Sequence, residues 1–288
     1  MKDSGSSSAH DFDKNFEKTE WNMLKKGFLT IFLAAAFLAV AMPSQARSLS
    51  KAILVITCDD GHWTQWEYLA PIMRNHGIVG TCYPVTSWIR NDYDFMYVSD
   101  LQTLKGRGWE MGNHTQNHTD ALAVADQTFL ADLEAAKQDL VGWGLGPVSA
   151  FAPPYGEFNS HTVELIKPRG YTSLRRACGE YNDTNYVSNF DAFGIEVISL
   201  KAATDMAKVK TWLNDLVDQK AAGVLVVHQV NVAGDPDSIT SAMAEEILGH
   251  AAGLIAEGQL ETLTVSQMVK KMRPADISAV ISLLLLDE

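Results

Sequence analysis

The sequence has few cysteines, and none of them stands in a C-x-x-C pair, so it gives no support to thiol redox chemistry. Its three cysteines are Cys58, Cys82 and Cys178, which can form at most one intramolecular disulfide. Cys58 and Cys82 end two consecutive strand-like runs. Neighbouring strands could join them in a disulfide, but because the cysteines are sparse we favour two small buried apolar residues.

Positive charge is also scarce. The chain has 23 Lys and Arg against 35 Asp and Glu, a net charge of -12 and a pI of about 5.1. Binding to a phosphate backbone requires a basic surface, so the composition argues against a nucleic-acid partner and against a strongly anionic polymer as the preferred substrate. Removal of residues 1–46 leaves 18 basic and 30 acidic side chains, so the acidity belongs to the rest of the chain.

No apolar run is long enough for a typical membrane span, but one near the N-terminus has the features of a signal peptide. In residues 23–46, Lys25 and Lys26 precede the apolar run 28–42, and Ser44-Gln45-Ala46 resembles a cleavage site. Residues 1–22 are then a misassigned start or a disordered leader. We expect a secreted or periplasmic protein without stable membrane insertion, although an uncleaved anchor stays an alternative. N-terminal sequencing of the exported protein should therefore begin at Arg47.

Linkers, repeats and low-complexity segments are missing from residues 47–288, which favours one domain in a chain of 288 residues with 47% hydrophobic residues. Short apolar runs alternate with amphipathic helical patterns along this region, as in an α/β barrel or a closely related wound sheet. The C-terminal segment 277–288 is apolar but too short to span a bilayer, and we expect a packing helix there. Strands are expected at 52–58, 78–85, 109–113, 148–154, 171–176, 195–200 and 224–230.

Polar residues whose side chains could bind a metal ion or take part in catalysis follow several of these strands. Two histidines in HTQNH, His114 and His118, have the i, i+4 spacing that places both rings on one face of a helical turn, within reach of one metal ion. In α/β barrels the carboxyl ends of the strands meet at one rim, so the strand-end residues should converge. Those residues are Asp59, Asp60, His114, the segment 153–156, Arg175, Arg176 and His228.

Four motifs in order resemble those of the NodB-like polysaccharide deacetylases of carbohydrate esterase family four. The resemblance covers residues 52–265. TCDDG at 57–61, HTQNH at 114–118, APPYG at 152–156 and LVVH at 225–228 are similar to the family's motifs. The resemblance implies a single-domain distorted or incomplete (β/α) barrel. It also implies one divalent metal ion held by Asp60, His114 and His118.

The residue types agree with the implied metal site, because two histidines and a carboxylate favour zinc. Three protein ligands also leave coordination positions open. Cobalt, nickel or manganese would also fit these ligands. Asp59 would then be the catalytic base and His228 the acid that protonates the departing amine. The backbone N–H of Tyr155, beside Pro154, would line the substrate site and stabilise the oxyanion. The implied reaction removes acetyl groups from N-acetylated sugars of a chitin-like polymer, peptidoglycan or an exopolysaccharide.

The chain departs from the family at three points. Ala152 stands where better-known members carry an arginine that orients the catalytic aspartate, and Cys58 replaces a phenylalanine. The family's Asp-Trp motif has no clear match. In one subgroup an arginine on the next strand resembles the replacement for the missing one, and Arg175 is the first choice here, with Arg176 as the second. A buried arginine beside Asp59 would keep that carboxylate ionised.

Two alternatives stay open at this point. An O-acetyl esterase acting on acetylxylan would use the same site, and an inactive carbohydrate-binding relative would keep the fold. A zinc protease is disfavoured because HTQNH has no glutamate after its first histidine. The sequence gives no sign of a partner protein, so we expect a monomer with a glycan substrate. Four further histidines have no comparable neighbours and are expected to be ordinary surface or core residues: His62, His76, His161 and His250.

Overall fold

The computed structural model describes residues 48–89, 93–177, 179, 181 and 183–273, all within one compact unit that begins at Ser48. The predicted signal peptide, the leader before it and the C-terminal segment 277–288 lie outside these residues. So does Cys178. Within the described residues, no helix is long and apolar enough to cross a membrane.

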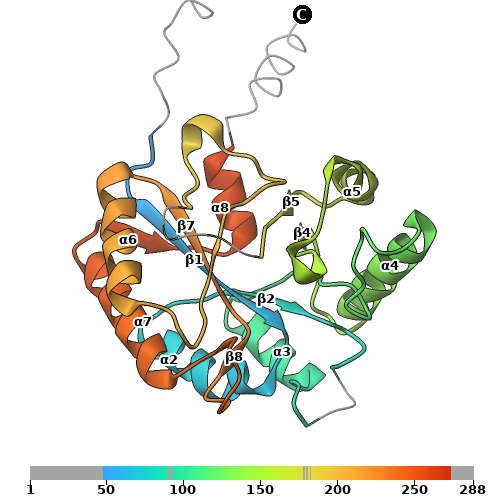
Figure 1. Ribbon diagram of the computed structural model, residues 1–288, viewed down its shortest axis with the longest axis horizontal. Helices are drawn as coiled ribbons and strands as arrows, with labels where there is room; N and C mark the ends of the chain where they lie inside the picture. The colour runs from blue at the N-terminus through green and yellow to red at the C-terminus, as the bar shows by residue number, and fades with distance from the viewer. Residues whose placement is uncertain (1–47, 90–92, 178, 180, 182, 274–288) are drawn as a thin grey trace, which may run out of the picture. The chain divides into compact units, whose positions relative to one another are not determined.

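A mostly parallel sheet forms the centre of the molecule (Figure 1). Its longest strand, β1 (Ala52–Asp60), pairs in parallel with β7 (Ala222–Val227) on one edge. On the other edge, the start of β1 pairs with β10 (Leu260–Thr262) and its end pairs with β2 (Thr81–Pro84). The sheet continues from β2 to β3 (Glu110–Met111) and from β7 to β6 (Ile198–Ser199).

Isolated bridges, each between one pair of residues, extend this sheet into a distorted barrel. An Asn113–Phe151 bridge links the end of β3 to β4 (Ala150–Phe151), which pairs in parallel with β5 (Ser173–Leu174). An Arg175–Ile195 bridge then joins β5 to the segment that leads into β6. The predicted fold class is therefore confirmed. The barrel is irregular because several strands have only two paired residues, which is shorter than the sequence pattern predicts.

Helices surround the central strands (Figure 1). A short parallel pair, β8 (Gln229–Val230) with β9 (Ser238–Ile239), follows β7. The helices are α2 (Ala70–Asn75), which follows a π-helical turn at Gln65–Leu69, α3 (Val98–Gly106), α4 (Asp126–Gly142), α5 (Ser160–Ile166), α6 (Met206–Gln219), α7 (Ser241–Ala256) and α8 (Val265–Met272), with 3-10 turns at Pro154–Gly156, Lys167–Arg169 and Val187–Asn189.

Strand β1 divides the core into two clusters because successive side chains point to opposite faces of a strand. Leu54 and Ile56 pack into the cluster under the outer helices, whereas Ile53 and Val55 belong to the inner cluster that includes α8. Asp59 continues the inner series, so its carboxylate is directed to the barrel interior at the end of the strand. The alternation thus explains how an acidic residue reaches a position that is only 1% exposed.

The two described cysteines are small buried residues, as favoured from the sequence. Cys58 and Cys82 are register partners on β1 and β2, and both thiols are free. Burial, together with the charge of Asp59, raises the pKa of the Cys58 thiol well above its usual value. Both thiols therefore stay protonated and unreactive at neutral pH.

Candidate metal and catalytic site

A cleft of about 260 Å³ lies where β1 and β7 end, at the rim predicted from the sequence. Residues from seven separate segments of the chain meet there, which only the closing of the sheet brings about. The lining residues are Asp59, Asp60, His114, His118, Pro153, Tyr155, Ala177, Ser199, Lys201, His228 and Asp237.

Three ligand-type atoms converge inside the cleft. One carboxylate oxygen of Asp60, Oδ1, lies 3.4 Å from His114 Nε2 and 3.5 Å from His118 Nε2. All three residues offer atoms within 4.8 Å of one another. Ligand atoms about 2.0–2.2 Å from one tetrahedral ion lie about 3.3–3.6 Å apart, so two of these spacings match a shared ion.

The loop that carries the two histidines is not helical, so the expectation of a helical turn is wrong. Thr115 and His118 have positive φ angles of 63° and 58°, which a helix does not allow. Side chains take the place of helical hydrogen bonds: Asn113 Oδ1 accepts from the Thr115 N–H at 2.7 Å, and Asp132 on α4 accepts from the Asn117 N–H at 3.1 Å. This local bonding brings the two imidazole centroids to 4.8 Å.

The environment of each group suits a metal ligand. His114 Nδ1 lies 2.7 Å from the Ala152 carbonyl, which fixes the ring and leaves Nε2 facing Asp60. Burial and the neighbouring His114 lower the pKa of His118 to about 4, so its ring is neutral at pH 7, the form that binds metals. Asp60 Oδ1 is buried and accepts no hydrogen bond from the described residues. A buried, unpartnered carboxylate oxygen facing two imidazole nitrogens fits a divalent cation.

Asp60 also occupies a strained backbone conformation, with φ of 67°. Tyr155, which also lines the cleft, has φ of 61°, and its ring lies 4.5 Å from that of His118. Such conformations cost about 1–3 kcal/mol each and persist only where the surroundings enforce them. Three cleft residues therefore have a strained backbone conformation that their surroundings enforce: Asp60, His118 and Tyr155.

Asp59 is the second buried carboxylate and has a different set of partners. The Arg175 guanidinium donates to its Oδ1, and His228 Nε2 lies 3.7 Å from its Oδ2. Burial raises the pKa of Asp59, but Arg175 and then the two histidines outweigh it and hold the pKa below its usual range. Asp59 is therefore ionised at neutral pH and faces His228 across the cleft.

Arg175 is fully buried and is fixed on several sides. Besides Asp59, it donates to the Arg176 carbonyl at 2.7 Å, and its guanidinium lies 4.9 Å from the centroid of the Tyr83 ring. Arg176 turns outward instead, where its half-exposed side chain pairs with Glu196 at 3.0 Å. Of the two arginines named from the sequence, Arg175 is the one that contacts Asp59.

Two residues in this region were missed by the sequence reading. Gln65 Nε2 donates to the Asp59 carbonyl and to the His228 carbonyl, both at 2.6 Å, and so joins the ends of β1 and β7. His62 Nε2 lies 3.5 Å from Asp60 Oδ2, and its ring stacks on Phe95 at 4.8 Å. The expectation of an isolated histidine is therefore wrong for His62. The sequence signal for His62 was its position directly after the Asp59-Asp60-Gly61 motif, whereas no motif in the sequence points to Gln65.

The remaining histidines lie at the surface, as expected, and pair with polar neighbours outside the cleft. His76 contacts Glu245 at 2.7 Å, and His161 contacts Asp126 at 2.8 Å. His250 contacts Asn214 at 2.9 Å.

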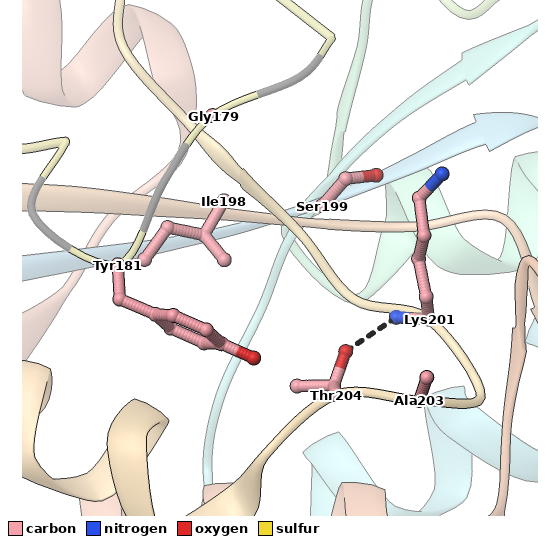
Figure 2. Close-up of a pocket in the computed structure, with 7 residues that line it drawn as sticks. All are labelled: Gly179, Tyr181, Ile198, Ser199, Lys201, Ala203 and Thr204. Carbon is pink, nitrogen blue, oxygen red and sulfur yellow. Dashed lines mark hydrogen bonds between the residues drawn. The ribbon is translucent and has the colours of Figure 1, made fainter.

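The cleft is also lined by polar residues for which the sequence gave no motif. Lys201 and Asp237 form an ion pair of 3.1 Å between half-exposed side chains. Ser199 lies two residues before Lys201, at the end of β6. Ser199 and Lys201, which also line the cavity drawn in Figure 2, belong to the stretch of sequence in which the family's Asp-Trp motif has no clear match.

Comparison with known proteins agrees with the geometry. The family model described as polysaccharide deacetylase matches residues 46–174, which contain Asp59, Asp60 and both histidines of the HTQNH loop. Over these residues the chain is therefore similar to the polysaccharide deacetylase family that its motifs resemble. Its barrel is likewise the fold of solved members of that family.

Three similar proteins illustrate the range of similarity. Peptidoglycan-N-acetylglucosamine deacetylase of Bacillus cereus is 29% identical over 127 residues, which are 43% of this chain and 56% of that protein. The Xyl-CE4 domain of a xylanase from the hindgut metagenome of Trinervitermes trinervoides has a TM-score of 0.54 at 16% identity, covering 77% of this chain and 91% of that one. A mutant of peptidoglycan deacetylase PdaC from Bacillus subtilis has a TM-score of 0.53 at 14% identity, covering 81% and 97%.

The two structural matches show a shared fold, since their sequence identities are below 25%. The chain spans 30–56% of the length of the curated relatives it matches.

Proposed function

We propose that the protein is a metal-dependent hydrolase that removes N-acetyl groups from an N-acetylhexosamine-containing glycan. The observation that carries the proposal is the pair of adjacent carboxylates with separate partners. Asp60 faces His114 and His118, whereas Asp59 lies between Arg175 and His228. One carboxylate would thus act as a metal ligand and the other as a base, and both line the same cleft.

Asp60, His114 and His118 would hold the ion. When bound, a divalent ion supplies Lewis-acid chemistry, since it polarises an acyl oxygen and lowers the pKa of water. Zinc is the ion we expect from two imidazoles and one carboxylate.

The other residues would move and hold the protons of amide hydrolysis. Asp59, which the neighbouring Arg175 guanidinium keeps ionised, takes a proton from the attacking water as the water oxygen bonds to the acetyl carbon. His228 Nε2 protonates the nitrogen as the C–N bond breaks, so that acetate and a free amine leave. The Tyr155 backbone N–H would donate to the developing oxyanion, with Pro154 holding the turn in place.

We further propose that the protein acts outside the cytoplasm, after removal of residues 23–46 as a signal peptide. The support is the sequence pattern before Arg47 and the name of the Bacillus cereus relative, a peptidoglycan deacetylase. Peptidoglycan, chitin-like polymers and exopolysaccharides all carry the acetamide that the site would cleave.

Acetate release from a panel of polymers tests the function. The zinc-loaded protein should release acetate from at least one N-acetylated glycan among peptidoglycan, chitin oligomers and poly-N-acetylglucosamine, and more slowly from acetylxylan. The matched control is Asp59→Asn, which keeps the volume of the side chain but removes the base. Release from acetylxylan alone would establish the O-acetyl esterase alternative, and no release from any polymer would favour an inactive carbohydrate-binding protein.

His62 is expected to strengthen metal binding by orienting Asp60. Its ring, stacked on Phe95, lies 3.5 Å from the carboxylate oxygen that does not face the other histidines. Loss of such a supporting partner typically weakens metal affinity about 10–100-fold. We therefore expect His62→Ala to raise the Kd for Zn²⁺ by that factor and His62→Gln, which can still donate, to restore much of it.

Competition with a fluorescent zinc chelator measures these Kd values without any substrate. The control is His161→Ala, because His161 pairs with Asp126 at the exposed surface. Equal zinc affinity in His62→Ala and the unaltered protein would rule out a supporting role for His62.

A further inference from the structure

We infer that Tyr83 is a positioning residue of the catalytic site, because its ring holds the Arg175 guanidinium against Asp59. In the proposed function Arg175 keeps Asp59 ionised and oriented. The inference deepens that proposal by assigning the residue that holds the arginine, and its kinetic test therefore rests on the proposed function. Tyr83 lies on β2, is fully buried and belongs to the inner core cluster.

Tyr83 and Asp59 lie side by side in the sheet. They are register partners on the parallel strands β2 and β1, so both side chains are directed to the barrel interior. The Arg175 side chain starts directly after β5 and reaches both of them. Its guanidinium donates to Asp59 Oδ1, and the guanidinium carbon lies 4.9 Å from the centroid of the Tyr83 ring. One planar cation thus contacts two neighbouring strands.

The buried charge of Arg175 depends on this aromatic contact. A guanidinium carries five N–H donors. Among the described residues, Asp59 Oδ1 and the Arg176 carbonyl accept hydrogen bonds from it, whereas its buried Nε has no partner. A charge removed from water is costly unless its surroundings interact with it. The face of an aromatic ring attracts a cation, and Tyr83 offers that face to the guanidinium.

The Tyr83 ring itself has a fixed place. A Cβ atom at position 112 would lie 2.1 Å from Tyr83 Cε1 and 2.4 Å from Cδ1, so the absence of a side chain at Gly112 makes room for the ring. The Tyr83 hydroxyl has no hydrogen-bond partner among the described residues. Burial raises the pKa of this hydroxyl well above its usual value, so it stays neutral. The ring face, rather than the hydroxyl, is therefore the part that acts on Arg175.

Kinetics of Tyr83→Leu on a glycan that the unaltered protein deacetylates test this role. The variant should lower kcat about threefold to thirtyfold, the effect of losing one desolvated cation–π contact. KM and zinc content should stay near the unaltered values, because Tyr83 does not line the cleft. Tyr83→Phe keeps the ring and should keep kcat. Equal losses in the Leu and Phe variants, or a normal kcat in folded Tyr83→Leu, would overturn the inference.

Trp212→Leu is the matched control for the loss of a core ring. Trp212 is also a buried aromatic residue that packs on a strand glycine, since a Cβ atom at Gly223 would lie 2.3 Å from its ring. It belongs to the outer core cluster, away from Arg175. Its replacement should lower the melting temperature and leave kcat unchanged. An equal loss of kcat in Trp212→Leu and Tyr83→Leu would contradict a specific role for Tyr83.

The Arg175→Ala background separates an action through Arg175 from a general effect on the site. If Tyr83 acts by holding the guanidinium, Tyr83→Leu should have little further effect on kcat once Arg175 has been removed. The same fold-change in both backgrounds would mean that Tyr83 acts independently of the arginine, and it would overturn the inference.

Crystal structures of Tyr83→Leu and of the unaltered protein decide the contact without any activity. In the variant we expect the Arg175 guanidinium to leave Asp59 Oδ1 or to adopt more than one orientation. The same Arg175 position in both structures would overturn the inference and leave the proposed function intact. Failure of the unaltered protein to release acetate from any N-acetylated glycan would instead refute the proposed function, and the two crystal structures would still decide whether Tyr83 positions Arg175.

Discussion

His114→Ala should remove both the bound metal ion and the acetyl-releasing activity. His114 is 2% exposed, its Nδ1 is fixed by the Ala152 carbonyl, and its Nε2 faces Asp60. Removing one of three protein ligands leaves a carboxylate and one imidazole, too few to hold a divalent ion tightly in a site of this type. Metal analysis after dialysis should show one zinc per unaltered chain and almost none in the variant.

His76→Ala is the matched control for this measurement. His76 pairs with Glu245 at the surface, outside the cleft, so its removal should leave zinc content unchanged. Circular dichroism should show that His114→Ala keeps its fold. A stoichiometric ion retained by folded His114→Ala would contradict the assignment of Asp60, His114 and His118 as the metal ligands.

Arg175→Ala should lower kcat about 10–100-fold while the metal ion stays bound. The guanidinium is the cation in contact with Asp59 Oδ1, and no metal-ligating group depends on it. Without it, Asp59 would lose both its orientation toward the attacking water and the charge that keeps it ionised. Steady-state kinetics, together with metal analysis of the same preparation, measures both expectations.

Arg176→Ala is the natural comparison, since Arg176 is half exposed and pairs with Glu196. We expect a small change in its kcat. Breaking a buried ion pair also costs about 3–5 kcal/mol of stability, so the melting temperature of Arg175→Ala should fall and kinetics should be measured well below it. Arg175→Lys keeps the charge but not the planar fork, and it should be intermediate. A normal kcat in folded Arg175→Ala would refute the orienting role.

Much of the fold could be read from the sequence because its determinants are local. The apolar run from Ala52 predicts a strand buried on both faces, and β1 is that strand. The long amphipathic segments of α4, α6 and α7 have a period that only a helix satisfies. Strand lengths were predicted less well, because β3, β4, β5 and β6 have two paired residues each and their limits depend on bridges to distant segments.

The sequence by itself determined the acidity of the chain, the barrel class and the residues with ligand chemistry, since each follows from composition, periodicity or ordered motifs. Only the tertiary structure decided which arginine reaches Asp59, because Arg175 and Arg176 are adjacent in sequence and point to opposite sides of a strand end. It also decided that the HTQNH loop is not a helix and that His62 lies against Asp60. Such contacts between distant segments, including the wall of Ser199, Lys201 and Asp237, arise only when the sheet closes and brings the strand ends together.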